Sequence, residues 1–145
     1  MKKIILTIVF LSFFAIACDS EDDVTYTTPD YISGKWFFDK QGTINTQNIV
    51  IYQDYVNTTN CEKDNLEFHP DGTYTSNDFE ANGSNCVNDV INGDYEVINK
   101  EIKLTYTEGN IEFETVFTIV SLTYTDVTVA GTNDLGEIIF FKLKR

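Results

Sequence analysis

From about residue 32 onward, hydrophobic and polar positions alternate, as they do in strands with one buried and one exposed face. The alternation is clearest late in the chain. Ile102, Leu104 and Tyr106 share one face opposite two polar residues, and the period of two continues through 111–119 and 127–129. The residues are also rich in Thr, Val, Ile, Tyr and Phe, which favour strands. The pattern predicts an all-β fold with antiparallel sheet.

Turn signals separate these runs. Pro70-Asp71-Gly72, Asn99-Lys100 and Glu108-Gly109-Asn110 each fall between two apolar runs and mark hairpin turns. Residues 78–90, rich in Asn and Asp, are predicted to form one long loop. We expect eight or nine strands, at about residues 35–40, 47–56, 65–69, 73–77, 91–98, 101–107, 111–120, 123–130 and 137–143.

A meander of this many strands leaves two exposed sheet edges unless the sheet closes on itself. The leading architecture is therefore an antiparallel up-and-down meander closed into a barrel, with a flattened sandwich as the alternative. No internal repeat is evident, and residues 32–145 are predicted to form a single domain.

The first seventeen residues have the pattern of a secretory signal. Lys2 and Lys3 precede thirteen mostly apolar residues, 4–16, which as a helix would span only about 20 Å, less than the roughly 30 Å of a bilayer core. An acidic run at residues 19–23 follows directly. We therefore expect residues 1–17 to be a cleaved signal peptide rather than a membrane span.

The residues at the cleavage point resemble the lipobox of bacterial lipoproteins. Ala15-Ile16-Ala17 places small residues before Cys18, and the resemblance implies that Cys18 is acylated and becomes the first residue of the mature chain. The alternative is an ordinary signal peptide that leaves Cys18 free. Residues 18–31 are interpreted as an acidic flexible tether.

The acidic segment after Cys18 also bears on location. Ser20-Glu21-Asp22-Asp23 resembles the surface-export signal of some Gram-negative lipoproteins, which implies an outer-membrane protein facing the cell surface. The alternative is that the run only solvates the tether.

The other two cysteines are Cys61 and Cys86. An exported domain lies in an oxidising compartment, so we expect them to form a disulfide that closes a loop of 25 residues. A metal site is the weaker interpretation, because His69 is the only histidine and no cysteine pair has metal-ligand spacing.

The charge of the chain excludes some partners. Ten Lys plus Arg against 23 Asp plus Glu give a formal charge of −13, which becomes −15 when the signal and its two lysines are removed. Nucleic acids and anionic lipid surfaces require a basic footprint, so neither is an expected partner. We expect a monomer anchored to a membrane only through lipid on Cys18.

The start of the mature domain resembles a lipocalin-like domain found in bacterial lipoproteins. Gly34-Lys35-Trp36 is similar to the Gly-x-Trp signature of lipocalins, and residues 61–74 and 93–95 add to the likeness. The resemblance implies a lipocalin-like barrel in which Trp36 plugs one end and a basic residue near the end of the last strand packs on it. Arg145 is the candidate, with Lys142 and Lys144 as alternatives.

The interior of such a barrel is either filled by side chains or open to one small ligand. Five residues are predicted to point inward, where large side chains favour filling but would line a cavity for an apolar ligand if one exists. They are Phe68, Tyr95, Leu104, Phe113 and Phe117.

Chemistry is not expected. His69 stands at a turn with no nucleophile motif near it, and Glu112 with Glu114 read as solubilising residues on an exposed face. A loop of carboxylates and amides could bind Ca²⁺, but its spacing matches no defined calcium loop. Its residues are Asp78, Asn82, Asn85, Asn88 and Asp89.

Two functions therefore remain open. The first is a surface or periplasmic lipoprotein whose barrel binds a small apolar ligand, and the second is a non-enzymatic surface interaction module with a filled interior. An enzyme is the weakest hypothesis, and no cofactor motif is present.

Overall fold

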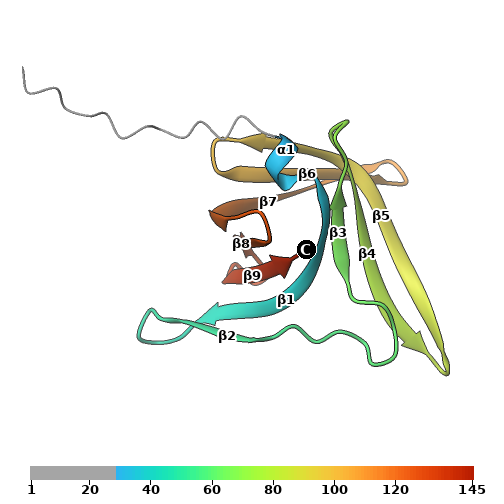
Figure 1. Ribbon diagram of the computed structural model, residues 1–145, viewed down its shortest axis with the longest axis horizontal. Helices are drawn as coiled ribbons and strands as arrows, with labels where there is room; N and C mark the ends of the chain where they lie inside the picture. The colour runs from blue at the N-terminus through green and yellow to red at the C-terminus, as the bar shows by residue number, and fades with distance from the viewer. Residues whose placement is uncertain (1–28) are drawn as a thin grey trace, which may run out of the picture.

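The computed structural model describes residues 29–145, which form one short helix and nine β-strands. Eight strands close into a barrel because β1 pairs with both β3 and β9, and β2 adds a further strand beside β1 (Figure 1). The predicted all-β antiparallel meander, closed into a barrel, is confirmed. The elements are α1 (Pro29–Ile32), β1 (Gly34–Ile44), β2 (Val50–Asp54), β3 (Asn65–Phe68), β4 (Thr73–Asn82), β5 (Asn85–Ile98), β6 (Glu101–Glu108), β7 (Ile111–Leu122), β8 (Asp126–Thr132) and β9 (Ile138–Lys144).

Strand β1 holds the barrel together because it pairs with three strands. Along one edge it pairs with β9, and a bulge between Phe38 and Lys40 shifts the register there. Along its other edge, its first residues pair with β3 and its last residues pair with β2. The segment 55–64 connects β2 to β3. A bulge of this kind bends and twists a strand, which lets β1 follow the curve of the barrel.

The barrel has two different ends. The closed end is formed by α1, the turns β3–β4, β5–β6 and β7–β8, and the end of β9. The open end is formed by the hairpins β1–β2, β4–β5, β6–β7 and β8–β9. The β4–β5 hairpin extends well beyond the others (Figure 1). The chain enters the barrel at the closed end, since α1 leads directly into β1.

The predicted loop at 78–90 is wrong. The β4–β5 ladder continues without a break from Asp78↔Asp89 to Asn82↔Asn85, and only Gly83 and Ser84 lie outside it. Gly83 has a φ of 68°, a left-handed conformation suited to a two-residue hairpin turn. This part of the hairpin is mostly exposed on both faces, so its residues show no alternation although the backbone pairs fully.

Smaller differences concern the strand ends and the helix. β1 extends four residues beyond its predicted end, and β2 is shorter than the predicted 47–56. The single turn of α1 is too short to give a helical period in the sequence. The predicted signal peptide, Cys18 and the tether up to residue 28 lie outside the described residues.

Alternate side chains of the strands form one core inside the barrel. Its buried members are Ile32, Trp36, Phe68, Tyr74, Tyr95, Ile102, Leu104, Val127, Val129 and Leu143. These residues come from nearly every barrel strand and lie toward the closed end. Among the residues that the structure describes, no helix is long and apolar enough to cross a membrane.

Candidate functional site

An aromatic residue and a cation seal the closed end. Trp36 is 0% exposed, and its Nε1 donates a hydrogen bond of 2.6 Å to the carbonyl of Ile32 in α1. The guanidinium of Arg145 lies 4.3 Å from the centre of the Trp36 ring. It also donates to the carbonyls of Tyr31 and Ser33, at 2.9 and 2.6 Å. These contacts tie the end of β9 to the segment that leads into β1.

The two alternative cations lie elsewhere. Lys142 points out of the barrel and stands 4.0 Å from the ring centre of Tyr52 on β2. Lys144 forms an ion pair of 3.1 Å with Asp39 at the β1 bulge. Of the three candidates from the sequence, the structure brings only Arg145 to Trp36.

The closed half of the interior is filled by side chains. The enclosed apolar space there amounts to only about 20 Å³, room for one water molecule. Ligand pockets have volumes of roughly 300–1,000 Å³. The space is lined by Ile32, Phe38, Leu66, Phe68, Ile102, Phe117, Val127, Val129, Phe141 and Leu143. No small-molecule ligand of ordinary size fits among these side chains.

The five predicted inward residues differ in how deeply they are buried. Phe68, Tyr95 and Leu104 are 4%, 7% and 6% exposed and belong to the filled core. Phe117 is half-buried, with its ring near that of Phe141. Phe113 lies beyond the core, in the open half, and is 37% exposed. The five residues line no continuous cavity, because the first three are packed in the core and Phe113 lies outside it.

Aromatic and aliphatic side chains remain exposed in the open half. The rings of Phe113 and Tyr106 stack with centres 5.0 Å apart. Each hairpin of the open end also carries exposed apolar side chains. They are Ile44, Ile49 and Ile51 on β1–β2, Val87 and Val90 on β4–β5, Ile111 and Phe113 on β6–β7, and Leu135 and Ile138 on β8–β9. The closed end also carries exposed apolar side chains, at Tyr31, Ile98 and Tyr124. Contiguous exposed apolar surface is typical of an interaction site.

The predicted disulfide between Cys61 and Cys86 is confirmed. It joins the segment 55–64 to the start of β5, with the two Cα atoms 5.7 Å apart. The segment also bonds to both neighbouring strands through Asp64. The backbone N–H of Phe38 donates to the Asp64 carbonyl at 3.1 Å, and that of Phe79 donates to its carboxylate at 2.9 Å. The segment therefore bridges β1 and β4 just before the first residue of β3.

Acidic groups gather where this segment meets the interior. Asp64 is only 4% exposed. Burial, with the nearby charge of Asp64, raises the pKa of Tyr55 to about 12. Burial, with the charges of Asp64, Glu80 and Asp89, also raises the pKa of Asp78. The negative charge of the Asp64 carboxylate thus opposes the loss of a proton from both neighbours.

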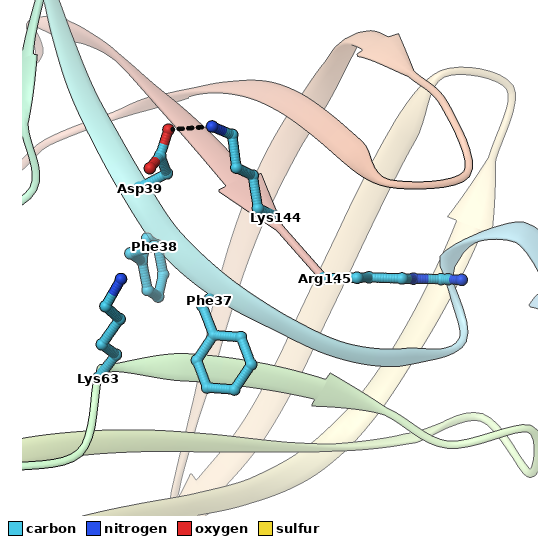
Figure 2. A pocket seen from close by; sticks show the side chains of 6 residues that line it. All are labelled: Phe37, Phe38, Asp39, Lys63, Lys144 and Arg145. Carbon is cyan, nitrogen blue, oxygen red and sulfur yellow. Dashed lines mark ion pairs between the residues drawn. The ribbon is translucent and has the colours of Figure 1, made fainter.

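A second hollow lies on the outer surface at the β1 bulge (Figure 2). It has a volume of about 380 Å³ and is lined by Phe37, Phe38, Asp39, Lys63, Lys144 and Arg145. Figure 2 shows Lys144 paired with Asp39, while the Arg145 side chain extends away from the other five. Lys144 and Asp39 neutralise each other, and the remaining charges of the lining, Lys63 and Arg145, are positive.

The residues considered for chemistry have structural partners. Nε2 of His69 lies 3.3 Å from the hydroxyl of Thr75, and Glu114 forms an ion pair of 2.6 Å with Lys103. The five residues considered for calcium lie on the two strands of the β4–β5 hairpin rather than in a loop. Within residues 29–145, no group of three His, Cys, Asp or Glu side chains has an arrangement that could hold a metal ion.

Comparison with known proteins bears on the fold. No family model matches the chain, and no curated protein matches it. A lipocalin-like protein from Bacteroides uniformis superposes with a TM-score of 0.52 and 14% identity, covering 78% of this chain and 96% of that one. An uncharacterized protein from Bacteroides eggerthii gives a TM-score of 0.50 and 16% identity, covering 80% of this chain and 100% of that one.

The fold is a lipocalin-like barrel. This agrees with the resemblance inferred from Gly34-Lys35-Trp36, and identities this low show the fold alone. The Gly34-Lys35-Trp36 signature could be recognised from the sequence because its residues are adjacent, and it marks the closed end of the barrel. Sequence reasoning placed Tyr106 on an inward face but missed its stacking on Phe113, and it missed Tyr55 and Asp64 entirely. Strand alternation carries no signal for the last two, because they lie in an irregular segment.

Proposed function

We propose that this protein is a lipid-anchored, non-enzymatic interaction module whose lipocalin-like barrel presents its open end to a partner. One observation supports this proposal above the others. The closed half of the barrel is filled to within about 20 Å³, while every hairpin of the open end carries exposed apolar side chains. A filled core stabilises the scaffold, and the exposed side chains are available to a partner.

The anchor belongs to the same proposal. Cys18 follows Ala15-Ile16-Ala17 and stands eleven residues before Pro29, so an extended tether would reach at most about 40 Å. The chain enters the barrel at the closed end. Acylation of Cys18 would therefore hold the closed end within about 40 Å of the membrane. We propose the outer membrane, with the barrel facing the cell surface, on the basis of the acidic residues that follow Cys18.

A second candidate function rests on the stacked pair in the open half. Tyr106 and Phe113 present aromatic surface that a small apolar or aromatic molecule could cover. Such a ligand would lie in the open half, above the filled core.

Site-specific photo-crosslinking in intact cells tests the two candidates. A photoreactive amino acid replaces Phe113, and in a matched control it replaces Val116 on the opposite face of the same strand. The two positions are 37% and 41% exposed, so solvent access is similar. A protein adduct at 113 but not at 116 is the expected result.

The alternative outcomes of the same experiment are distinct. A small-molecule adduct at 113, detected by mass spectrometry of the purified protein, would favour the second candidate. Equal yields of adduct at 113 and 116, or none at either, would contradict an interaction surface at the open end.

A further inference from the structure

Strands β5 and β6 separate from each other before either of them ends. Their ladder runs only from Asp94↔Thr105 to Ile98↔Glu101. β5 begins nine residues earlier, at Asn85, where it pairs with β4, and β6 continues to Glu108, where it pairs with β7. Between the two strands lies a cleft of about 380 Å³, here called the β5–β6 cleft. It is lined by Asp89, Val90, Ile91, Asn92, Tyr106, Thr107 and Glu108.

The backbone along this cleft is available for pairing. The N–H of Tyr95 donates to Gly72 on the β4 side. Because successive residues of an antiparallel strand direct their backbone groups to opposite sides, Val90 and Asn92 direct theirs into the cleft. Just before β6, the Lys100 carbonyl accepts a hydrogen bond from Ile119 of β7, so even-numbered residues of β6 direct their backbone groups to β7. Thr107 therefore directs its backbone groups into the cleft. Within residues 29–145, no strand pairs with these edges.

The separation is built into the packing. A Cβ atom added to Gly93 would lie 2.2 Å from the carbonyl oxygen of Thr105 and 2.7 Å from the Tyr74 ring. Only glycine allows β5 to cross this closely over the buried Tyr74 and then leave β6. The cleft therefore begins at a point held by the core, and it opens toward the open end of the barrel.

The side chains of the cleft define what would fit it. Ile91 and Tyr106 face the interior next to the closed part of the ladder, and Asp89 and Glu108 face the same side two residues farther along each strand. On one face of an added strand, residues i and i+2 would meet these two layers in turn. An apolar side chain fits the first layer, and a lysine or arginine fits the second. The formal charge of −13 favours a basic partner over any distance at which charge is not screened.

We propose that the β5–β6 cleft binds an extended peptide by strand addition, and that the peptide has an apolar residue and a basic residue two positions apart. The three β6 residues that line the cleft span about 10 Å, so the paired core of the peptide is about three to five residues long. Backbone hydrogen bonds provide the binding energy, and the two side-chain layers provide specificity. The inference rests on the proposed role of the open end and names the chemistry of its partner.

Fluorescence anisotropy of the mature chain with a synthetic probe tests the inference. The probe is a labelled, N-acetylated peptide in which Leu and then Lys alternate with Thr. We expect saturable binding that weakens with rising ionic strength. N-methylation of alternate backbone amides in the probe should weaken binding at least about tenfold, because the ladder bonds are lost. Replacing its Lys with Glu should also weaken binding, because the probe would then carry charge of the same sign as the cleft.

Variants of the protein locate the binding site. Asp89→Asn and Glu108→Gln should each weaken binding about two- to fivefold, as expected for partly exposed ion pairs. Val90→Pro removes an N–H that faces the cleft and not β4, so it should block binding while leaving the β4–β5 ladder intact. Circular dichroism of each variant checks the fold. Glu112→Gln, on the outward face of β7, is the matched charge control and should bind like the wild type.

Three results would overturn the inference. They are no binding of the probe, equal binding of the N-methylated probe, and equal binding by a folded Val90→Pro variant. Self-association that Val90→Pro abolishes, without probe binding, would assign the cleft to a second copy of the chain and would equally overturn it. A protein adduct at position 113 alongside any of these results would leave the proposed function intact and remove only the peptide-binding cleft.

Discussion

The guanidinium of Arg145 covers the ring of Trp36 at 4.3 Å and so connects the two ends of the barrel chain, which are more than a hundred residues apart in sequence. Two hydrogen bonds from the same guanidinium reach the carbonyls of Tyr31 and Ser33. This contact lies at the closed end, and the hairpins of the open end each carry exposed apolar side chains. The contact therefore couples the first barrel strand to the last.

Removing the Trp36 ring should destabilise the whole barrel. Trp36→Ala leaves a cavity beneath α1 and should lower the free energy of unfolding by about 3–5 kcal/mol. Arg145→Ala, which removes a cation–π contact and two hydrogen bonds, should cost about 1–3 kcal/mol. Urea unfolding measures both. Phe113→Ala at the open end is the control and should cost less than about 1 kcal/mol. Equal effects of Trp36→Ala and Phe113→Ala would contradict the role of Trp36 as a plug.

Loss of the disulfide should act mainly on the segment that it ties down. The double variant Cys61→Ala/Cys86→Ala should lower stability by about 2–5 kcal/mol, and the 25-residue separation corresponds to roughly 3 kcal/mol of chain entropy. Hydrogen exchange should accelerate first in residues 55–64. Titration of the mature, unreduced wild type should find no thiols from this pair. Two reactive thiols there would show that the bond does not form in the cell.

The hydroxyl of Tyr55 should titrate at about pH 12, because burial and the charge of Asp64 oppose its ionisation. The folded state holds this proton more tightly than the unfolded chain, whose tyrosine pKa is 10.0. The contribution to stability is therefore present in full below pH 10 and is lost as the pH rises toward about 12. Ultraviolet absorbance of tyrosinate, compared between the wild type and Tyr55→Phe, isolates this group. A Tyr55 signal centred near pH 10 would contradict the buried position.

Asp78 should make stability fall as the pH rises through the carboxyl range. Its raised pKa means that the folded state binds the proton more strongly than the unfolded chain, so this contribution is greatest below the unfolded value of 3.8. It disappears as the pH rises through the folded pKa. Asp78→Asn should therefore be more stable than the wild type at neutral pH, and the gap should narrow in acid. Urea unfolding across this range measures the difference. A constant gap, or a less stable variant at neutral pH, would count against the effect of burial and of the Asp64 charge on Asp78.

The anchor can be tested apart from the fold. Cys18→Ala should abolish acylation, leaving the precursor uncleaved or releasing the protein, because no thiol remains to carry lipid. Detergent partitioning and intact-mass measurement follow both outcomes. Ser20→Ala is a control two residues away that keeps the cysteine. A Cys18→Ala variant that still partitions into detergent as a mature species would refute lipid attachment at this position.

Much of the fold could be predicted from the sequence because a strand's side chains alternate with a period of two. That period separated the inward residues 102, 104 and 106 from their outward neighbours. Turn chemistry then placed the hairpins β3–β4, β5–β6 and β6–β7, and the need to pair both sheet edges predicted closure. The β4–β5 hairpin escaped the same reasoning, since Asn and Asp residues exposed on both faces pair through their backbone without any hydrophobic pattern.

The sequence by itself determined the strand faces, the closed end marked by Trp36 and Arg145, and the pairing of Cys61 with Cys86. Only the tertiary structure decided how the interior is divided. Phe68 and Phe113 both read as inward residues, yet one is buried in a filled core and the other is exposed. Alternation reports which face a side chain occupies. How deeply it lies inside depends on strand tilt, on bulges and on the close crossing at Gly93, all of which arise from packing between strands that are distant in sequence.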